Sequence, residues 1–114
     1  MIGSSMRRIA FLLLLAACDP PFEMKGDVVD GDGKPIANAH VALVCDGTEV
    51  RRADSDGSGR FDDREIGFFP LRCTVEVHAA NRPVASIPLR DVCMAGPRED
   101  TCNEIVLHAH LARR

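Results

Sequence analysis

Short segments in which apolar residues occupy every second position, each closed by turn-forming residues, run through most of this chain. Ala39, Val41 and Leu43 show this period, which is typical of a half-buried strand. The residues from Asp30 to Pro35 (Asp-Gly-Asp-Gly-Lys-Pro) form a dense turn signal. Further strands are expected over 25–29, 49–53, 60–62, 71–79, 84–89 and 103–111. No segment carries an apolar stripe at helical spacing over three turns, so the pattern predicts one all-β sandwich.

The N-terminal residues have the composition of an export signal. Arg7 and Arg8 precede an apolar run that ends in Leu15-Ala16-Ala17-Cys18. A basic region, a short apolar region and a small-residue cleavage site make up a secretory signal. The run 9–17 is far shorter than the roughly 20 residues that a transmembrane helix requires. We therefore expect residues 1–17 to be a signal peptide.

The cysteine at the end of this signal resembles the lipobox of bacterial lipoproteins. The resemblance implies that Cys18 is acylated, becomes the first mature residue and attaches the protein to the inner or outer membrane of the cell envelope. The resemblance also implies several acyl chains on Cys18, which agrees with the marginal membrane binding that one chain gives. Residues 18–23 are expected to form the lipidated end and a stiff spacer, since Pro20 and Pro21 favour an extended backbone.

Charge limits the partners of the mature chain. The sequence has 17 acidic against 14 basic residues, and Arg7 and Arg8 leave with the signal. The remaining basic residues are scattered singly, which gives no electrostatic footprint for nucleic acid. We expect the membrane, through Cys18, and an envelope protein or polysaccharide as partners.

Four cysteines remain once Cys18 is assigned to the lipid, and in an exported domain they predict two disulfides. Of the three connectivities, the strand period favours Cys45–Cys73, because both residues share a face with the apolar residues of their strands. Cys93–Cys102 would then close a local loop. A zinc site is disfavoured, because the chain has no C-x-x-C pair.

Residues 24–80 resemble the carboxypeptidase regulatory-like domain, a transthyretin-like sandwich of seven strands. The resemblance rests on Gly26, Val28, Asp30, Gly33, Pro35, Ile36, Ala39, Val41 and Leu43, followed by Asp56, Gly59 and Phe61. It implies a non-catalytic domain over residues 24–112. Family members usually have a glycine and a tyrosine around the fifth strand, whereas here Cys73 precedes that strand and Asn81-Arg82-Pro83 follows it.

Catalytic patterns are not found in the sequence. It contains neither H-E-x-x-H nor His-x-x-Glu, and no serine lies in a glycine elbow. Transthyretin-like hydrolases end in a characteristic tetrapeptide, whereas this chain ends in His110-Leu111-Ala112-Arg113-Arg114. Intradiol dioxygenases, which have a related sandwich, bind iron through tyrosines, and this sequence has none. We expect no enzyme, with a small envelope enzyme as the least favoured alternative.

Residues 54–65 match the twelve-position calcium loop of an EF-hand. The ligands would be Asp54, Asp56, Ser58, Asp62 and Glu65, with Gly59 at the sixth position. The flanking residues are not helical in pattern, and such a loop equally suits a plain turn before Phe61. A calcium-dependent adhesion or sensor domain is therefore the alternative function.

The four histidines are expected on polar strand faces. His108 and His110 share one face and would give a metal only two ligands. His40 and His78 are expected at the surface.

Overall fold

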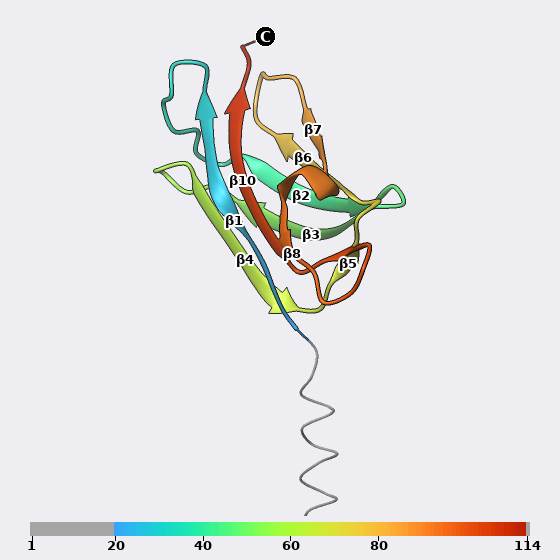
Figure 1. Cartoon of the computed structure of the whole chain (residues 1–114). Helices are drawn as coiled ribbons and strands as arrows, with labels where there is room; N and C mark the ends of the chain where they lie inside the picture. The colour runs from blue at the N-terminus through green and yellow to red at the C-terminus, as the bar shows by residue number, and fades with distance from the viewer. Residues whose placement is uncertain (1–19, 114) are drawn as a thin grey trace, which may run out of the picture.

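Residues 20–113 of the computed structural model form two stacked β-sheets (Figure 1). The strands are β1 (Pro21–Asp30), β2 (His40–Cys45), β3 (Thr48–Asp54), β4 (Arg60–Ile66), β5 (Phe69–Pro70), β6 (Thr74–His78), β7 (Ala85–Pro88), β8 (Cys93–Ala95), β9 (Thr101–Cys102) and β10 (Glu104–Leu111). One helical turn, α2 (Leu89–Val92), joins β7 to β8. The all-β sandwich predicted from the alternation is confirmed.

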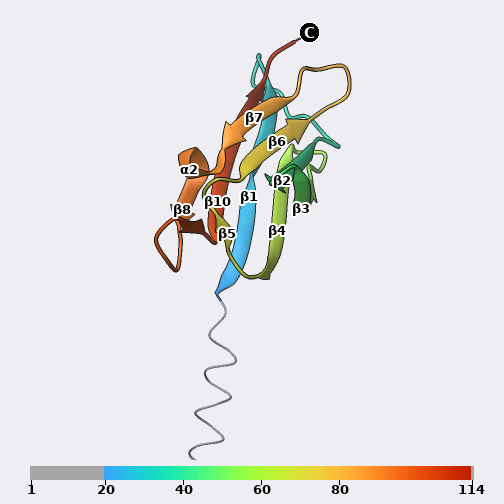
Figure 2. The same cartoon turned by 90° about the vertical axis from the view of Figure 1, so that its right-hand side faces the viewer.

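The two main sheets have four strands each. The first has the order β4-β1-β10-β8 and the second β3-β2-β6-β7, while β5 and β9 form a small separate ribbon. In Figure 1 the first sheet lies in front of the second, and their strands cross at a steep angle. Figure 2 shows β5 and β8 near the end of the domain where β1 begins. β1 and β10 are parallel neighbours, although they come from opposite ends of the described chain.

The strand period determines which side chains form the core. On β10, the residues Ile105, Leu107, Ala109 and Leu111 are buried, and those between them face outward. Each fully buried aliphatic side chain contributes roughly 1.5–3 kcal/mol to stability. The two sheets share a buried layer made up of Phe22, Met24, Val28, Val41, Leu43, Phe61, Val75, Val77, Ile105, Leu107 and Leu111.

Gly26 lies where the backbones of β1 and β10 approach closely. Its register partner is Leu107. A Cβ atom built on Gly26 would lie 1.7 Å from the Leu107 carbonyl oxygen, far inside any van der Waals contact. Only a hydrogen atom fits between the two strands here, so this position requires glycine.

β1 begins earlier than the sequence predicts. We expected a strand from Lys25 after a spacer, but the structure starts β1 at Pro21. Phe22 is 1% exposed, and its ring packs edge-on against Phe69 with 5.1 Å between centroids. The assignment of residues 21–23 to a spacer is therefore wrong, because the aromatic contact makes them part of the core.

Other strand ends differ in smaller ways. The strand expected over 60–62 extends to Ile66, and the one expected over 71–79 is limited to Thr74–His78. The strand expected over 84–89 ends at Pro88, because the buried Leu89 begins the helical turn α2.

The seven strands implied by the family resemblance differ from the two four-stranded sheets of the structure. The short strands β5, β8 and β9 form around the Cys93–Cys102 disulfide: Phe69 of β5 pairs with Cys102, and β8 begins at Cys93.

Candidate functional site

The expected lipidation residue, Cys18, and the expected signal peptide lie outside the described residues. The nearest described residue, Pro20, accepts a hydrogen bond on its carbonyl oxygen from the Gly67 amide at 2.9 Å. Within residues 20–113, no helix has the length and apolar character needed to cross a membrane.

The first disulfide joins the end of β2 to the residue that precedes β6. Cys45 and Cys73 have a Cα–Cα distance of 4.5 Å, and both pack against the core. This is the pairing favoured by the strand faces. The bond links two neighbouring strands of the second sheet at one end.

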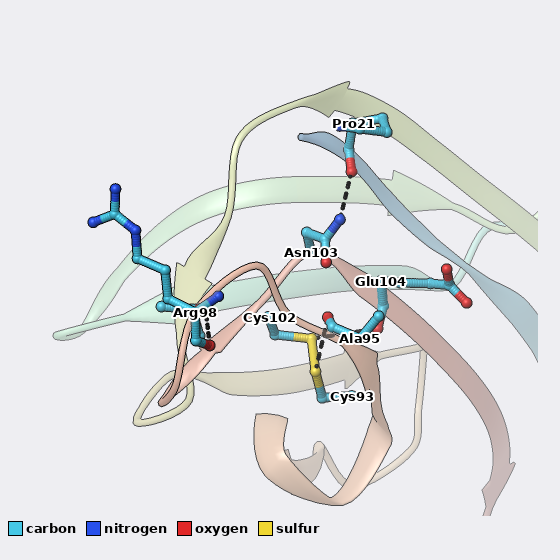
Figure 3. The surroundings of a disulfide bond; sticks show 8 residues. Pro21, Cys93, Ala95, Arg98, Cys102, Asn103 and Glu104 are labelled. Atoms are coloured by element: carbon cyan, nitrogen blue, oxygen red, sulfur yellow. Dashed lines mark hydrogen bonds between the residues drawn. A yellow bond between two sulfur atoms is a disulfide. The ribbon is translucent and has the colours of Figure 1, made fainter. Parts of the chain in front are cut away.

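The second disulfide, Cys93–Cys102, joins β8 to β9 with a Cα–Cα distance of 5.9 Å, also as predicted (Figure 3). Next to it, the side-chain amide of Asn103 donates a hydrogen bond to the Pro21 carbonyl oxygen at 3.0 Å. The residue after Cys102 therefore also fixes the start of β1 next to the disulfide. Two disulfides in one small domain suggest an oxidising, extracytoplasmic compartment.

Asp56 organises the turn between β3 and β4. Its Oδ1 atom accepts hydrogen bonds from the Ser58 amide at 2.9 Å, the Ser58 hydroxyl at 2.8 Å and the Arg60 amide at 3.0 Å. The Ser58 hydroxyl, followed by these backbone donors, lowers the pKa of Asp56. These three hydrogen bonds hold Oδ1 in the turn.

The structure does not bring the five expected calcium ligands together. Residues 60–66 are an extended strand, which places Glu65 about 16 Å along β4 from Arg60. Glu65 lies beside Arg51 there, with 3.5 Å between Oε2 and Nη1. The EF-hand interpretation of Glu65 is therefore wrong, because that loop requires its last ligand to fold back onto the first. No group of three or more His, Cys, Asp or Glu side chains within residues 20–113 is arranged to hold a metal.

We expect calcium to leave the stability of the protein unchanged. Adding millimolar calcium should not shift the melting temperature, because the expected ligands within residues 20–113 do not converge on one point. Differential scanning calorimetry measures this directly, with Asp56→Ala as the control. A rise in melting temperature that Asp56→Ala abolishes would show that the loop binds calcium.

Three of the acidic residues do line a common hollow. A depression of about 410 Å³ lies between β1, the end of β3 and the start of β4, and its lining residues are Lys25, Gly26, Asp54, Asp56, Arg60, Phe61 and Asp62. Several of these charges already have neighbours of opposite sign: Lys25 Nζ lies 2.9 Å from Glu23, and Asp62 lies 3.3 Å from Arg64. Asp54 lies 2.6 Å from His40 Nδ1, a contact that lowers the pKa of Asp54. The hollow therefore has charges of both signs, and these three are paired with neighbours outside its lining.

The comparisons with known proteins concern the fold alone. No known family and no curated protein matches the sequence. Among solved structures, chlorocatechol 1,2-dioxygenase from Pseudomonas putida matches with a TM-score of 0.55 at 13% identity, over 83% of this chain and 61% of that one. The dioxygenase domain of a carbohydrate-binding fusion protein from Streptomyces sp. SirexAA-E matches with a TM-score of 0.54 at 20% identity, over 85% and 84%.

The sandwich resembles that of intradiol dioxygenases. Catechol 1,2-dioxygenase from Pseudomonas arvilla also matches, with a TM-score of 0.54 at 15% identity over 84% of this chain and 53% of that one. The chain thus spans less than two thirds of the length of the first dioxygenases it matches.

The iron site of such enzymes does not fit this chain. Intradiol dioxygenases bind iron through tyrosines, and the sequence contains no tyrosine. His108 contacts Asp27 on the outer face of the first sheet, whereas His40 and His78 pair in register on the second. The described histidines therefore offer no set of side chains that could replace the missing ligands.

One polar contact between the sheets was not foreseen from the sequence. Arg51 of β3 and Asp63 of β4 both point inward at the open edge of the sandwich and form two hydrogen bonds of 2.7 and 2.6 Å. Their side chains are only 25% and 13% exposed. The Asp63 carboxylate raises the pKa of Arg51, and the pair joins the edge strands of the two sheets.

A second unforeseen polar contact involves Ser55, which is 3% exposed. Its hydroxyl donates to the Ile36 carbonyl at 2.7 Å and accepts from the Ala39 amide at 2.9 Å. The side chain therefore fixes the β1–β2 connection against the end of β3. No sequence pattern distinguishes this serine from the neighbouring turn residues.

Proposed function

We propose that this protein is a lipid-anchored, non-catalytic binding or accessory domain of the bacterial cell envelope. The observation that carries the proposal is the junction between anchor and domain. Cys18 lies two positions before Pro20, and Pro21 is already the first residue of β1. The two disulfides agree with exposure of the domain to an oxidising compartment.

The carboxypeptidase regulatory-like assignment is supported by what its pattern residues do. Gly59 adopts a positive φ of 77°, and its amide donates to the Asp56 carbonyl oxygen to close the turn. Phe61 follows and is 4% exposed. Gly26 allows the close contact with Leu107 of β10. These are structural roles, which agrees with a family whose members are non-catalytic.

Recognition of a partner would use the charged hollow beside β4. Its lining offers both charge signs, which suits hydroxyl-rich or peptide ligands of the envelope. The same charges are paired with neighbours, and this favours a binding surface over a site with a free acid or base.

Replacing the anchor residue tests the proposal. We expect Cys18→Ser to abolish acylation, because serine offers no thiol. The variant should remain an uncleaved precursor or leave the membrane fraction. Fractionation of cells, with mass spectrometry of the N-terminal peptide, measures both effects. The control is Gly31→Ala, an open turn position that leaves Cys18 intact. If Cys18→Ser is processed and fractionates as the unaltered protein does, the lipoprotein proposal is wrong.

A further inference from the structure

Two large apolar side chains are exposed at the end of the sandwich where β1 begins. Ile66, the last residue of β4, is 67% exposed, and Phe68, which precedes β5, is 37% exposed. Only Gly67 separates them. Exposed apolar side chains that lie together on one loop are candidates for contact with an apolar surface.

The same loop is hydrogen-bonded to the first residue of the described chain. The Gly67 amide donates to the Pro20 carbonyl oxygen at 2.9 Å, and Ile66 is the register partner of Pro21. Two residues of extended chain span at most about 7 Å, which limits the distance between the Cα atoms of Cys18 and Pro20. The loop from Ile66 to Phe68 therefore lies close to Cys18.

The start of β1, to which this loop is bonded, is fixed to the rest of the domain. Phe22 is buried against Phe69, and the Asn103 side chain holds the Pro21 carbonyl oxygen beside the Cys93–Cys102 disulfide (Figure 3). These contacts leave Asp19 as the one residue between Cys18 and the described domain.

We propose that the loop Ile66-Gly67-Phe68 inserts into the surface of the lipid bilayer. The inference rests on the proposed lipid anchor: acyl chains on Cys18 place that residue in the headgroup layer, which is roughly 5–8 Å thick on each side of a bilayer. Because Pro20 lies within about 7 Å of Cys18, the loop bonded to it reaches the same layer. Insertion removes the apolar surface of Ile66 and Phe68 from water.

The position of Arg98 agrees with insertion of Phe68 into the bilayer surface. Its guanidinium carbon lies 5.6 Å from the centre of the Phe68 ring, a cation–π arrangement. A guanidinium group also hydrogen-bonds phosphate well, so Arg98 can contact lipid phosphates while Phe68 lies deeper. The acidic residues Glu99 and Asp100 are close in sequence, and the contact is therefore expected with neutral phospholipid rather than through net positive charge.

A single tryptophan can report the contact, because the chain contains neither Trp nor Tyr. The full-length, lipidated Ile66→Trp variant is reconstituted into phosphatidylcholine vesicles with or without bromine on the acyl chains. We expect its emission to shift to shorter wavelength and to be quenched by the brominated lipid. Phe68→Trp provides a second position on the same loop with the same expected result.

The matched control is Val84→Trp. Val84 is 53% exposed and immediately precedes β7, in a connection that lies at the opposite end of the sandwich from the start of β1 (Figures 1 and 2). Its emission should remain that of an indole in water, with no quenching. If the loop tryptophans are quenched no more than the Val84→Trp control, the membrane contact is wrong.

Flotation of the vesicles distinguishes failure of the lipid anchor at Cys18 from failure of the proposed insertion of the loop Ile66-Gly67-Phe68. Protein that floats with the vesicles while both loop tryptophans stay in water leaves the lipid anchor intact and overturns the contact. Protein that does not float, and behaves as its Cys18→Ser variant does, overturns both.

Discussion

Gly26→Ala should lower the free energy of unfolding by about 3 kcal/mol, the upper end of the usual cost of overpacking, and in a domain of this size it can prevent folding altogether. The added methyl group would lie 1.7 Å from the Leu107 carbonyl oxygen, and neither backbone can move without breaking the β1–β10 pairing. Thermal unfolding followed by circular dichroism measures the loss.

Gly31→Ala is the matched control for Gly26→Ala. A Cβ atom there meets nothing within 4 Å, so the free energy of unfolding should change little. Equal stability of the two variants would show that β1 and β10 can separate at Gly26, contrary to the close approach described here.

Removing Cys45 and Cys73 together, as a double alanine variant, should cost about 3–4 kcal/mol in the free energy of unfolding. This value follows from the loop-entropy account for cysteines separated by 28 residues. Denaturant unfolding under oxidising conditions measures it. The matched variant lacks Cys93 and Cys102, which are separated by 9 residues, and should lose only about 2.5 kcal/mol.

Peptide mapping without reductant verifies the two disulfide pairings on which this comparison depends. Cys45 should be recovered linked to Cys73, and Cys93 linked to Cys102. A larger loss of unfolding free energy without Cys93–Cys102 than without Cys45–Cys73 would contradict the loop-entropy account. The extra loss would then come from contacts near the shorter loop, such as the hydrogen bond between Asn103 and Pro21.

The parts of the fold that follow the two-residue period could be predicted from the sequence. β10 was expected over 103–111 and occupies Glu104–Leu111, because its apolar residues alternate without interruption. The same period places Cys45 and Cys73 on the inner face, where they form a disulfide. Local patterns are sufficient when each residue type agrees with its strand position.

The parts that the sequence could not predict depend on contacts between distant segments. Pro20 and Pro21 are typical of a spacer, but burial of Phe22 against Phe69 extends β1 through that region. Arg51 and Asp63 occupy inward positions that the strand period would assign to apolar residues. Their contact across the sandwich offsets the cost of burying two polar side chains.

The same limit applies to the candidate calcium loop. The spacing of its acidic residues matches an EF-hand, yet spacing along the sequence does not record whether the chain coils or extends. β4 is extended, so Glu65 pairs with Arg51 instead of returning to Asp54.

The parallel pairing of β1 with β10 also determines how the domain would resist mechanical force. The register runs from Glu23 with Glu104 to Asp30 with Leu111, so the start of β1 and the end of β10 lie at opposite ends of one ladder. A pull on these two points loads the hydrogen bonds of the ladder together, in shear, and does not open them one after another. A domain tethered at the start of β1 and held by a load at the end of β10 would therefore be pulled along its most resistant direction.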